Sequence, residues 1–167
     1  NSRAVPFKFA FGASSCVPAT PFESAGARIG PDEVREMLTW PEIGFLAEMM
    51  NFPGAIAGDP EVMAKIAAAH ALGKPVDGHA PGLIGPELAR YIDHGIRTDH
   101  ECLSHAEARE KIGLGMKILL REGSAAKNLD MLLPLLDEFP EHCMFATDDI
   151  KPDDLARDHI RLLVSRA

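Results

Sequence analysis

The chain has 167 residues and a mass of 18.1 kDa, enough for one domain with an apolar core, and 46% of its residues are apolar against 25% charged. This composition disfavours disorder, and no apolar run approaches the roughly 18 residues that cross a bilayer, so we expect no membrane partner. The formal net charge of −8 offers no basic field to a phosphate backbone, so we expect a small neutral or cationic substrate rather than nucleic acid.

The three cysteines, Cys16, Cys102 and Cys143, lie far apart and form no C-x-x-C pair. This spacing predicts reduced thiols, and an N-terminal sequence without the pattern of a secretion signal predicts a cytoplasmic protein. Because the chain opens on Asn1-Ser2-Arg3 and is in a strand-like run by Phe7, we expect its front end to be cut or processed.

Strand-like runs alternate with helix signals along the whole chain. Alternating aromatic residues predict a first strand over residues 5–13, and further strands are expected near residues 43–49, 75–79, 96–100, 116–121 and 142–148. Helices are expected to begin at a proline followed by an acid or at a capping box: Pro31, Pro60, Pro86, Pro152 and Ser104-x-x-Glu107. Left-handed cap residues are expected at Gly73, Gly95 and Gly113.

The last two helices are predicted from leucine stripes with helical spacing. One stripe comprises Leu129, Leu132, Leu133 and Leu136, and the other comprises Leu155, His159, Leu162 and Leu163. Pro134 falls early enough in the first of these helices to predict a kink rather than a stop.

This alternation predicts an α/β fold with a parallel sheet, either open and doubly wound or closed as a (β/α) barrel. A dinucleotide-binding open sheet would carry G-x-G-x-x-G after its first strand, and this chain does not. Polar residues instead stand at the exit of every expected strand, as at the C-terminal ends of barrel strands: Ser15, Glu48, His79, His100, Arg121-Glu122 and Asp148. We therefore predict a TIM-type barrel domain over residues 1–167.

A complete barrel has eight strand–helix units and about 250 residues, whereas the chain accounts for six units. We therefore expect the chain to carry strands three to eight, with the first two units upstream. The open edges of such a partial barrel predict self-association or a rearranged partial barrel rather than a clean monomer, and we expect a homo-oligomer.

Two histidines and two carboxylates at strand ends predict a metal site made by Glu48, His79, His100 and Asp148. Imidazole and carboxylate ligands suit Zn, Mn, Fe or Co, and the absence of thiolate ligands disfavours a structural zinc. Each residue also has a purely structural interpretation. A histidine can be a hydrogen-bonded core residue, Glu48 can form a buried ion pair, and Asp148 or Asp149 can cap the last helix.

Residues beside these candidates can support the same site. Asp99 and Glu101 flank His100 and can hydrogen-bond an imidazole that binds a metal. The segment Arg121-Glu122-Gly123-Ser124 can bind substrate or merely turn the chain.

Several runs together resemble bacterial adenine deaminase of the amidohydrolase superfamily. They are W-P-E-I-G-F-L-A-E-M-M-N-F-P-G (40–54), G-H-A-P-G-L (78–83), T-D-H-E (98–101), L-R-E-G-S-A-A-K-N-L (120–129), T-D-D (147–149) and the turn Ser15-Cys16-Val17-Pro18. The resemblance implies a metal-dependent barrel of the hydrolase kind that converts adenine and water into hypoxanthine and ammonia by attack of a metal-activated water on C6. It also implies a pair of Mn or Fe ions in the complete enzyme, with Zn possible.

By position, the resemblance implies that Glu48 bridges the metals, that His79 and His100 are ligands, and that Asp148 is a ligand and proton carrier. It implies a purine pocket shaped by Ser15, Cys16, Arg121, Glu122 and Ser124, with Asp99, Glu101 and Asp149 supporting the ligands. The family's histidine motif after strand one, its next histidine segment and its small β domain are absent, so we expect the isolated chain to be inactive. Two alternatives stay open: another amidohydrolase acting on a cyclic amide or amidine, and a non-catalytic partial barrel.

Overall fold

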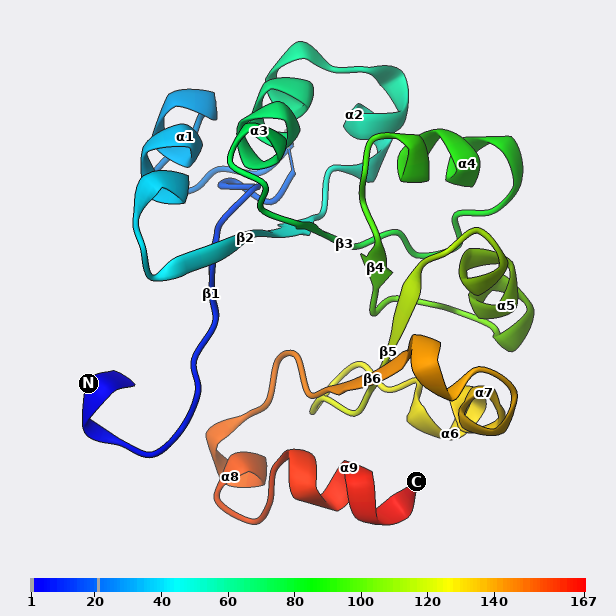
Figure 1. Ribbon diagram of the computed structural model, residues 1–167. Coiled ribbons are helices and arrows are strands. Elements are labelled where there is room, and N and C mark those ends of the chain that lie inside the picture. The colour runs from blue at the N-terminus through cyan, green and yellow to red at the C-terminus, as the bar shows by residue number, and fades with distance from the viewer. Residues whose placement is uncertain (1, 21) are drawn as a thin grey trace. The chain divides into compact units, whose positions relative to one another are not determined.

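The computed structural model describes residues 2–20 and 22–167, which form two compact units. The first unit ends at Asp77, and the second runs from Gly78 to Ala167. Sheets of three strands, β1-β2-β3 and β4-β5-β6, form with helices beside them (Figure 1). An α/β fold with parallel strands is therefore confirmed, whereas the barrel and the single domain stay predictions.

The first unit has strands β1 and β2 in parallel, with Gly12 opposite Phe45 and Ala13 opposite Leu46. Its elements in chain order are η1 (Ser2–Ala4), β1 (Phe11–Ala13), α1 (Pro31–Thr39), β2 (Ile43–Met49), α2 (Phe52–Ala57), α3 (Pro60–Ala71) and β3 (Val76–Gly78), which reaches into the second unit. Helices α1 and α3 pack side by side (Figure 1). The core between helices and sheet contains Val34, Leu38, Leu46, Met49, Ile66 and Ala69.

The first strand is much shorter than predicted, because only residues 11–13 pair with β2. The aromatic rings of Phe7, Phe9 and Phe11 contact one another in sequence and are all exposed. Their alternation thus places the rings on one face of an extended segment, but that face does not cover the core. Helix α2 was not predicted, and it begins where the side chain of Asn51 accepts a hydrogen bond from Gly54 N at 3.0 Å.

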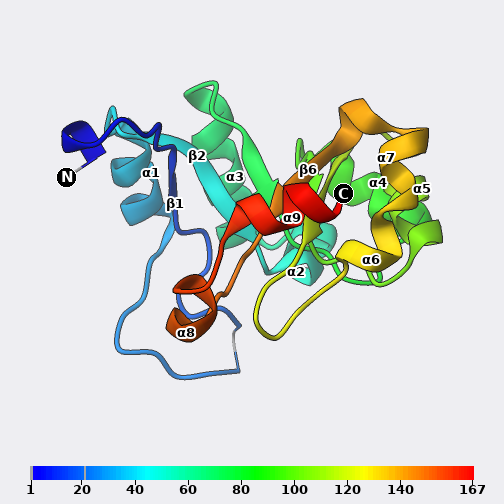
Figure 2. The same ribbon diagram turned by 90° about the horizontal axis from the view of Figure 1, so that it is seen from below.

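The second unit contains the parallel strands β4 (Thr98–Asp99), β5 (Lys117–Arg121) and β6 (Cys143–Ala146), in that spatial order. Its helices are α4 (Gly85–Asp93), α5 (His105–Gly113), α6 (Leu129–Leu132), α7 (Pro134–Glu138), η2 (Pro140–His142), α8 (Pro152–Leu155) and α9 (Ile160–Arg166). Helix α9 packs against β6 (Figure 2). The buried apolar residues of this unit include Leu88, Tyr91, Ile112, Met116, Ile118, Leu120, Leu129, Leu132 and Leu135.

The predicted helix starts at Pro31, Pro60, Pro86 and Pro152 are confirmed within a residue, and Ser104 caps α5 by accepting from Glu107 N at 3.1 Å. The cap at Gly113 is wrong, because that residue is still helical and Gly115 adopts the left-handed conformation with φ 91°. Met116 N donates to Lys111 O and Gly115 N to Ile112 O, the hydrogen bonds of a Schellman motif centred on Gly115.

The two leucine stripes form shorter helices than predicted. The first divides at Leu133 into α6 and α7, and Leu133 keeps helical dihedral angles, so Pro134 begins a new helix after a kink. The second divides into α8 and α9, with Leu155 and Leu162 exposed and only Leu163 of this stripe buried. Among the described residues, no helix combines the length and the apolar character that crossing a membrane requires.

Candidate metal centre

His79 directly follows the short strand β3 and His100 directly follows β4, and both histidines belong to the second unit. Their rings meet edge to face, with Nδ1 of His79 3.3 Å from Nε2 of His100. The backbone on both sides is fixed by buried polar side chains: His79 N donates to Tyr91 OH at 3.1 Å, and Asn128 Nδ2 donates to His100 O at 3.0 Å. The structure therefore brings the two predicted histidines together.

Gly78 permits this pairing because a side chain would not fit before His79. A Cβ atom at this position would lie 2.1 Å from the Thr98 carbonyl oxygen and 2.8 Å from the Ile96 side chain. Gly78 N also donates to the hydroxyl of Thr98 at 3.0 Å. Only glycine allows the backbones before the two histidines to approach so closely.

Two carboxylates and one guanidinium lie beside the histidine pair. Oε1 of Glu101 is 3.8 Å from His79 Nδ1 and 3.8 Å from His100 Nε2. Arg121, the last residue of β5, binds both carboxylate oxygens of Glu101 and donates to Asp148 Oδ2 at 2.5 Å. Burial alone would lower the pKa of Arg121, but Glu101 and Asp148 outweigh it and raise that pKa, so the guanidinium stays charged.

The backbone of Asp148 is in the left-handed region, with φ 54°, which aspartate tolerates better than most side chains. Gly123 makes room for this loop, since a Cβ atom there would lie 2.7 Å from Thr147 O and 2.9 Å from Asp149 O. Helix α8 begins after Lys151 without a side-chain cap, so neither Asp148 nor Asp149 caps it. The structural interpretation of these two residues as caps is therefore wrong.

The second unit's site fits a divalent transition metal. Two imidazole nitrogens bound at about 2.0–2.1 Å in a tetrahedral arrangement stand about 3.3 Å apart, which matches the 3.3 Å between His79 and His100. Ligand atoms of His100, Glu101 and Asp148 also lie within 4.8 Å of one another. Imidazole nitrogen and carboxylate oxygen are the donors that Zn, Mn and Fe take.

Glu48, Ser15 and Cys16 belong to the first unit. Glu48 is the penultimate residue of β2, and its backbone carbonyl accepts the Ser15 hydroxyl at 2.5 Å. Ser15 is buried, and its own carbonyl accepts from Lys65 Nζ at 2.9 Å.

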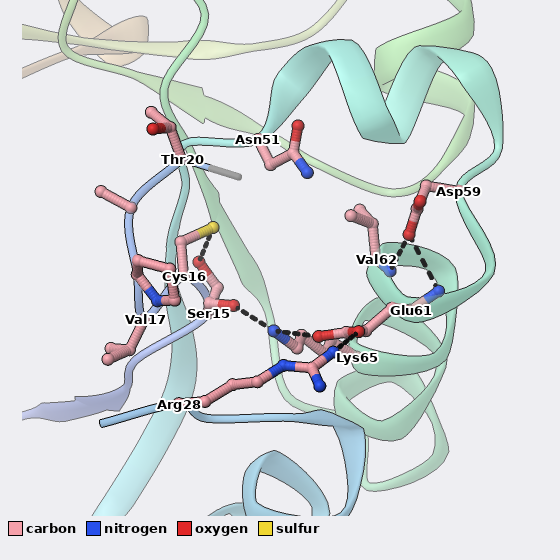
Figure 3. Close-up of a pocket in the computed structure, with 12 residues that line it drawn as sticks. Ser15, Cys16, Val17, Thr20, Arg28, Asn51, Asp59, Glu61, Val62 and Lys65 are labelled. Atoms are coloured by element: carbon pink, nitrogen blue, oxygen red, sulfur yellow. Dashed lines mark hydrogen bonds and ion pairs between the residues drawn. The ribbon is translucent and has the colours of Figure 1, made fainter. Parts of the chain in front are cut away.

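Cys16 lines a pocket of about 210 Å³ with polar side chains, among them Thr20, Arg28, Asn51 and Glu61 (Figure 3). Figure 3 shows the Lys65 ammonium pointing at the Ser15 carbonyl and the Arg28 guanidinium at Glu61.

Glu122 and Ser124 line a separate pocket of about 200 Å³ in the second unit. Glu122 pairs with Arg166 at 2.9 Å, while the Ser124 hydroxyl donates to Asp154 at 2.6 Å and accepts from Lys151 N. Both side chains thus have structural partners around a polar opening. Asp149 contributes its carbonyl, which accepts from Ser124 N at 3.0 Å.

Asp99 lies in a fully buried cluster with Lys111, whose ammonium is 2.7 Å from Asp99 Oδ2 and 2.5 Å from Glu107 Oε1. Burial would raise the pKa of Asp99, but Lys111 outweighs it and lowers that pKa; conversely, burial would lower the pKa of Lys111, and Asp99 raises it. Burial and Asp99 raise the pKa of the Cys102 thiol, which donates to Asp99 Oδ2 at 3.2 Å. The acidic side chains here are neutralised by an ammonium ion rather than offered to a metal.

Sequence reasoning missed four residues whose side chains form hydrogen bonds with the backbone at or just after the two histidines: Tyr91, Glu107, Lys111 and Asn128. Glu107 and Lys111 have the i,i+4 spacing of an exposed helix pair, so the sequence alone gave no sign that they are buried. For Asn128 the sequence offered only its place in the run 120–129, which resembles the family. In the structure its side-chain oxygen accepts from Arg121 N, and its side-chain nitrogen donates to the His100 carbonyl.

Comparison with known proteins supports the resemblance found in the sequence. No protein-family model matches the chain. Three curated relatives are adenine deaminases: one from Salinibacter ruber is 60% identical over 167 residues, one from Sulfurovum is 58% identical over 167, and one from Borreliella burgdorferi is 47% identical over 173. Each alignment covers all of this chain, which spans about 31% of the length of the first two relatives and 32% of the third. The chain is therefore homologous over its whole length to adenine deaminases and corresponds to about a third of such a protein.

Proposed function

We propose that this chain forms part of a metal-dependent adenine deaminase, which hydrolyses adenine to hypoxanthine and ammonia. The observation that carries the proposal is the histidine pair, whose nitrogens lie 3.3 Å apart in a chain 60% identical to an adenine deaminase. Its donor spacing suits a metal, and the activity of the relatives supplies the reaction. The substrate is a small purine, in keeping with the net charge of −8.

The proposed fold of the whole protein is a (β/α) barrel of the TIM type. Two features support it: the strands are parallel, and within each sheet they follow one another in chain order. Chain order of neighbouring strands is a property of barrels, whereas a doubly wound sheet reverses its order at a switch point.

We assign metal-binding roles to Glu48, His79, His100 and Asp148. The metals are Mn or Fe, two in the complete enzyme, with Zn as the third possibility. A bound divalent metal supplies a Lewis acid that makes water a nucleophile near neutral pH. His79 and His100 would hold the metal through their ring nitrogens, and Glu48 would supply a carboxylate ligand common to both ions.

Asp148 acts as the proton carrier of the reaction. Its carboxylate takes a proton from the attacking water and passes it to the purine ring or to the departing ammonia. Arg121 holds Oδ2 of Asp148 at 2.5 Å and therefore fixes the direction in which the carboxylate faces. Arg121 also holds Glu101, so one guanidinium orients two carboxylates near the histidine pair.

Ser15, Cys16, Glu122 and Ser124 are proposed to shape the purine pocket, since they line polar openings in their own units. Arg121 would contribute to this pocket through the carboxylates that it orients, because its own side chain is only 5% exposed.

The three free cysteines support a cytoplasmic location. A homo-oligomer is the proposed assembly.

The isolated 167-residue chain is proposed to be inactive, because it supplies two imidazoles and two carboxylates for a reaction that uses two ions. The test uses a chimera in which this chain replaces the corresponding segment of the Salinibacter ruber adenine deaminase, hereafter the Salinibacter chimera. With Mn²⁺ or Fe²⁺ and adenine, the chimera should release hypoxanthine and ammonia, and the isolated chain should not. A chimera that binds metal but hydrolyses only a cyclic amide such as a dihydroorotate would favour the alternative function, that of another amidohydrolase acting on a cyclic amide or amidine. Robust turnover by the isolated chain would overturn its proposed inactivity.

A further inference from the structure

The loops that follow His79 and His100 are joined by a buried cluster of three charged side chains. Asp99 precedes His100, while Glu107 and Lys111 lie one turn apart on α5. All three are at most 5% exposed. Asp99 and Glu107 reach these loops through hydrogen bonds to backbone amides, so they act on the site through the backbone.

Each carboxylate of the cluster binds one amide from each loop. Asp99 Oδ1 accepts from Ala80 N at 2.9 Å and from Glu101 N at 3.2 Å. These are the residues directly after His79 and His100. A single oxygen atom therefore ties together the two peptide groups that follow the histidines.

Glu107 binds backbone amides of the same two loops, two residues further along each. Its Oε1 accepts from Gly82 N at 2.9 Å, and its Oε2 accepts from Leu103 N at 2.9 Å. These residues are three positions beyond His79 and His100 respectively. The two carboxylates thus hold the loops at two matching points.

Lys111 completes the cluster by holding both carboxylates and one loop. Its ammonium donates to Asp99 at 2.7 Å, to Glu107 at 2.5 Å and to the Ala80 carbonyl at 2.7 Å. The three N–H donors of the Lys111 ammonium are therefore all used. Its positive charge also allows the two buried carboxylates to lie side by side.

We propose that Asp99, Glu107 and Lys111 are positioning residues that set the spacing of His79 and His100, and so the affinity of this pair for a divalent metal. The inference rests on the proposed function, because it assumes that the pair binds metal. Partners outside the ligands themselves commonly change metal affinity by about 10–100-fold when they are removed. Here the coupling runs through four backbone amides rather than through the imidazole rings.

The test is Glu107→Gln in the 167-residue chain, because glutamine keeps the volume but has one acceptor oxygen for two amides. We expect faster hydrogen exchange at Gly82 or Leu103 and an affinity for Zn²⁺ about tenfold lower, measured by calorimetric titration of the metal alone. The matched control is Glu110→Gln on the same helix. Glu110 also accepts from a backbone amide, Gly85 N at 2.6 Å, but this bond is exposed and not shared with the His100 loop. The variant Glu110→Gln should leave the Zn²⁺ affinity of the chain unchanged.

A second measurement separates this inference from the proposed function. In the metal-free chain, the edge-to-face rings of His79 and His100, with centroids 5.2 Å apart, should give a proton–proton Overhauser effect that weakens in Glu107→Gln. A wild-type chain that binds no Zn²⁺ but shows this effect, and loses it in the variant, would overturn the metal site and support the positioning. Equal Zn²⁺ affinity and an equal Overhauser effect in both chains, despite faster exchange at Gly82 or Leu103, would overturn the positioning role.

Discussion

Arg121, at the end of β5, donates from Nη1 to Oδ2 of Asp148 over 2.5 Å, and so joins the loop after β6 to the end of the neighbouring strand. The same Nη1 group also binds Glu101, which follows His100. One guanidinium thus links the ends of three successive strands. Because it occupies one oxygen of Asp148, the orientation of that carboxylate is set before any substrate binds.

The first prediction concerns Asp148→Asn in the Salinibacter chimera. Asparagine keeps an oxygen for Arg121 and for a metal but does not act as a proton carrier. We expect metal content close to that of the parent chimera and turnover lower by about 10²–10⁴-fold. Metal analysis together with ammonia release checks both values, and a variant with parental turnover would refute the role of Asp148.

The second prediction concerns Glu48→Gln in the same chimera. A bridging carboxylate neutralises two cations, whereas the neutral amide does not, so metal bound per protein should fall in this variant. The measurement is elemental analysis after dialysis against a metal-free buffer. Equal metal content in Glu48→Gln, Asp148→Asn and the parent would contradict the assignment of different roles to the two carboxylates.

Sequence alone predicted the elements whose signals are local. Pro31 with its acidic neighbours marks α1, and the apolar run of residues 43–49 marks β2, because capping and burial act within a few residues. Prediction from the sequence failed where the secondary structure of a segment depends on partners that are distant along the chain. The aromatic alternation of residues 5–13 predicts a strand, but only residues 11–13 meet a partner strand.

The candidate site shows the same division. His79 and His100 were predicted from their places after strands, and the structure brings them together. Asp99 was expected to support an imidazole, yet it pairs with Lys111, twelve residues away on α5. The burial of a lysine is set by the tertiary packing of α5 and cannot be read from an i,i+4 charge pair.

The third prediction concerns the pH dependence of stability. The folded-state pKa of Lys111 is raised, so its stabilising contribution is complete below its unfolded pKa of about 10.4 and is lost as pH rises through the folded value. Removing one partner of a buried pair costs about 3–5 kcal/mol, so Lys111→Met should be less stable than wild type by this amount at pH 7.

Urea unfolding of both chains from pH 7 to 12 checks this expectation. The difference in unfolding free energy between wild type and Lys111→Met should shrink at the alkaline end. Lys117→Met, at an exposed position, is the control and should show a small difference at every pH. A difference for Lys111 that stays constant to pH 12 would show that its charge does not stabilise the fold.

The fourth prediction compares two glycines in strands. A Cβ atom at Gly78 would meet Thr98 O at 2.1 Å, whereas at Gly44 the nearest atom would be Phe11 O at 3.9 Å. Gly78→Ala should therefore lower the unfolding free energy by about 1–3 kcal/mol and weaken Zn²⁺ binding, because β3 must move away from Thr98. Gly44→Ala should change neither quantity appreciably. Equal thermal stability of the two variants would refute the close approach at Gly78.

The last prediction concerns self-association of the 167-residue chain. The exposed rings of Phe7, Phe9 and Phe11 form a continuous row, with centroid separations of 5.0 and 5.7 Å, that leads into β1, the end strand of the order β1-β2-β3. An apolar row beside a strand edge favours pairing with a second copy, because the pairing would bury the rings and satisfy backbone groups together.

Phe9→Lys should therefore weaken self-association, because it places a charge at the centre of the row, and charged residues are what native strand edges use to prevent pairing. Phe22→Lys is the matched control, since Phe22 is 95% exposed and its ring has no described aromatic neighbour. Sedimentation velocity over a hundredfold range of protein concentration should show wild type and Phe22→Lys shifting to larger species together, with Phe9→Lys remaining smaller. If the wild-type chain is monomeric over the whole range, or if Phe9→Lys associates as strongly as wild type, the aromatic row is not the surface through which copies of this chain meet.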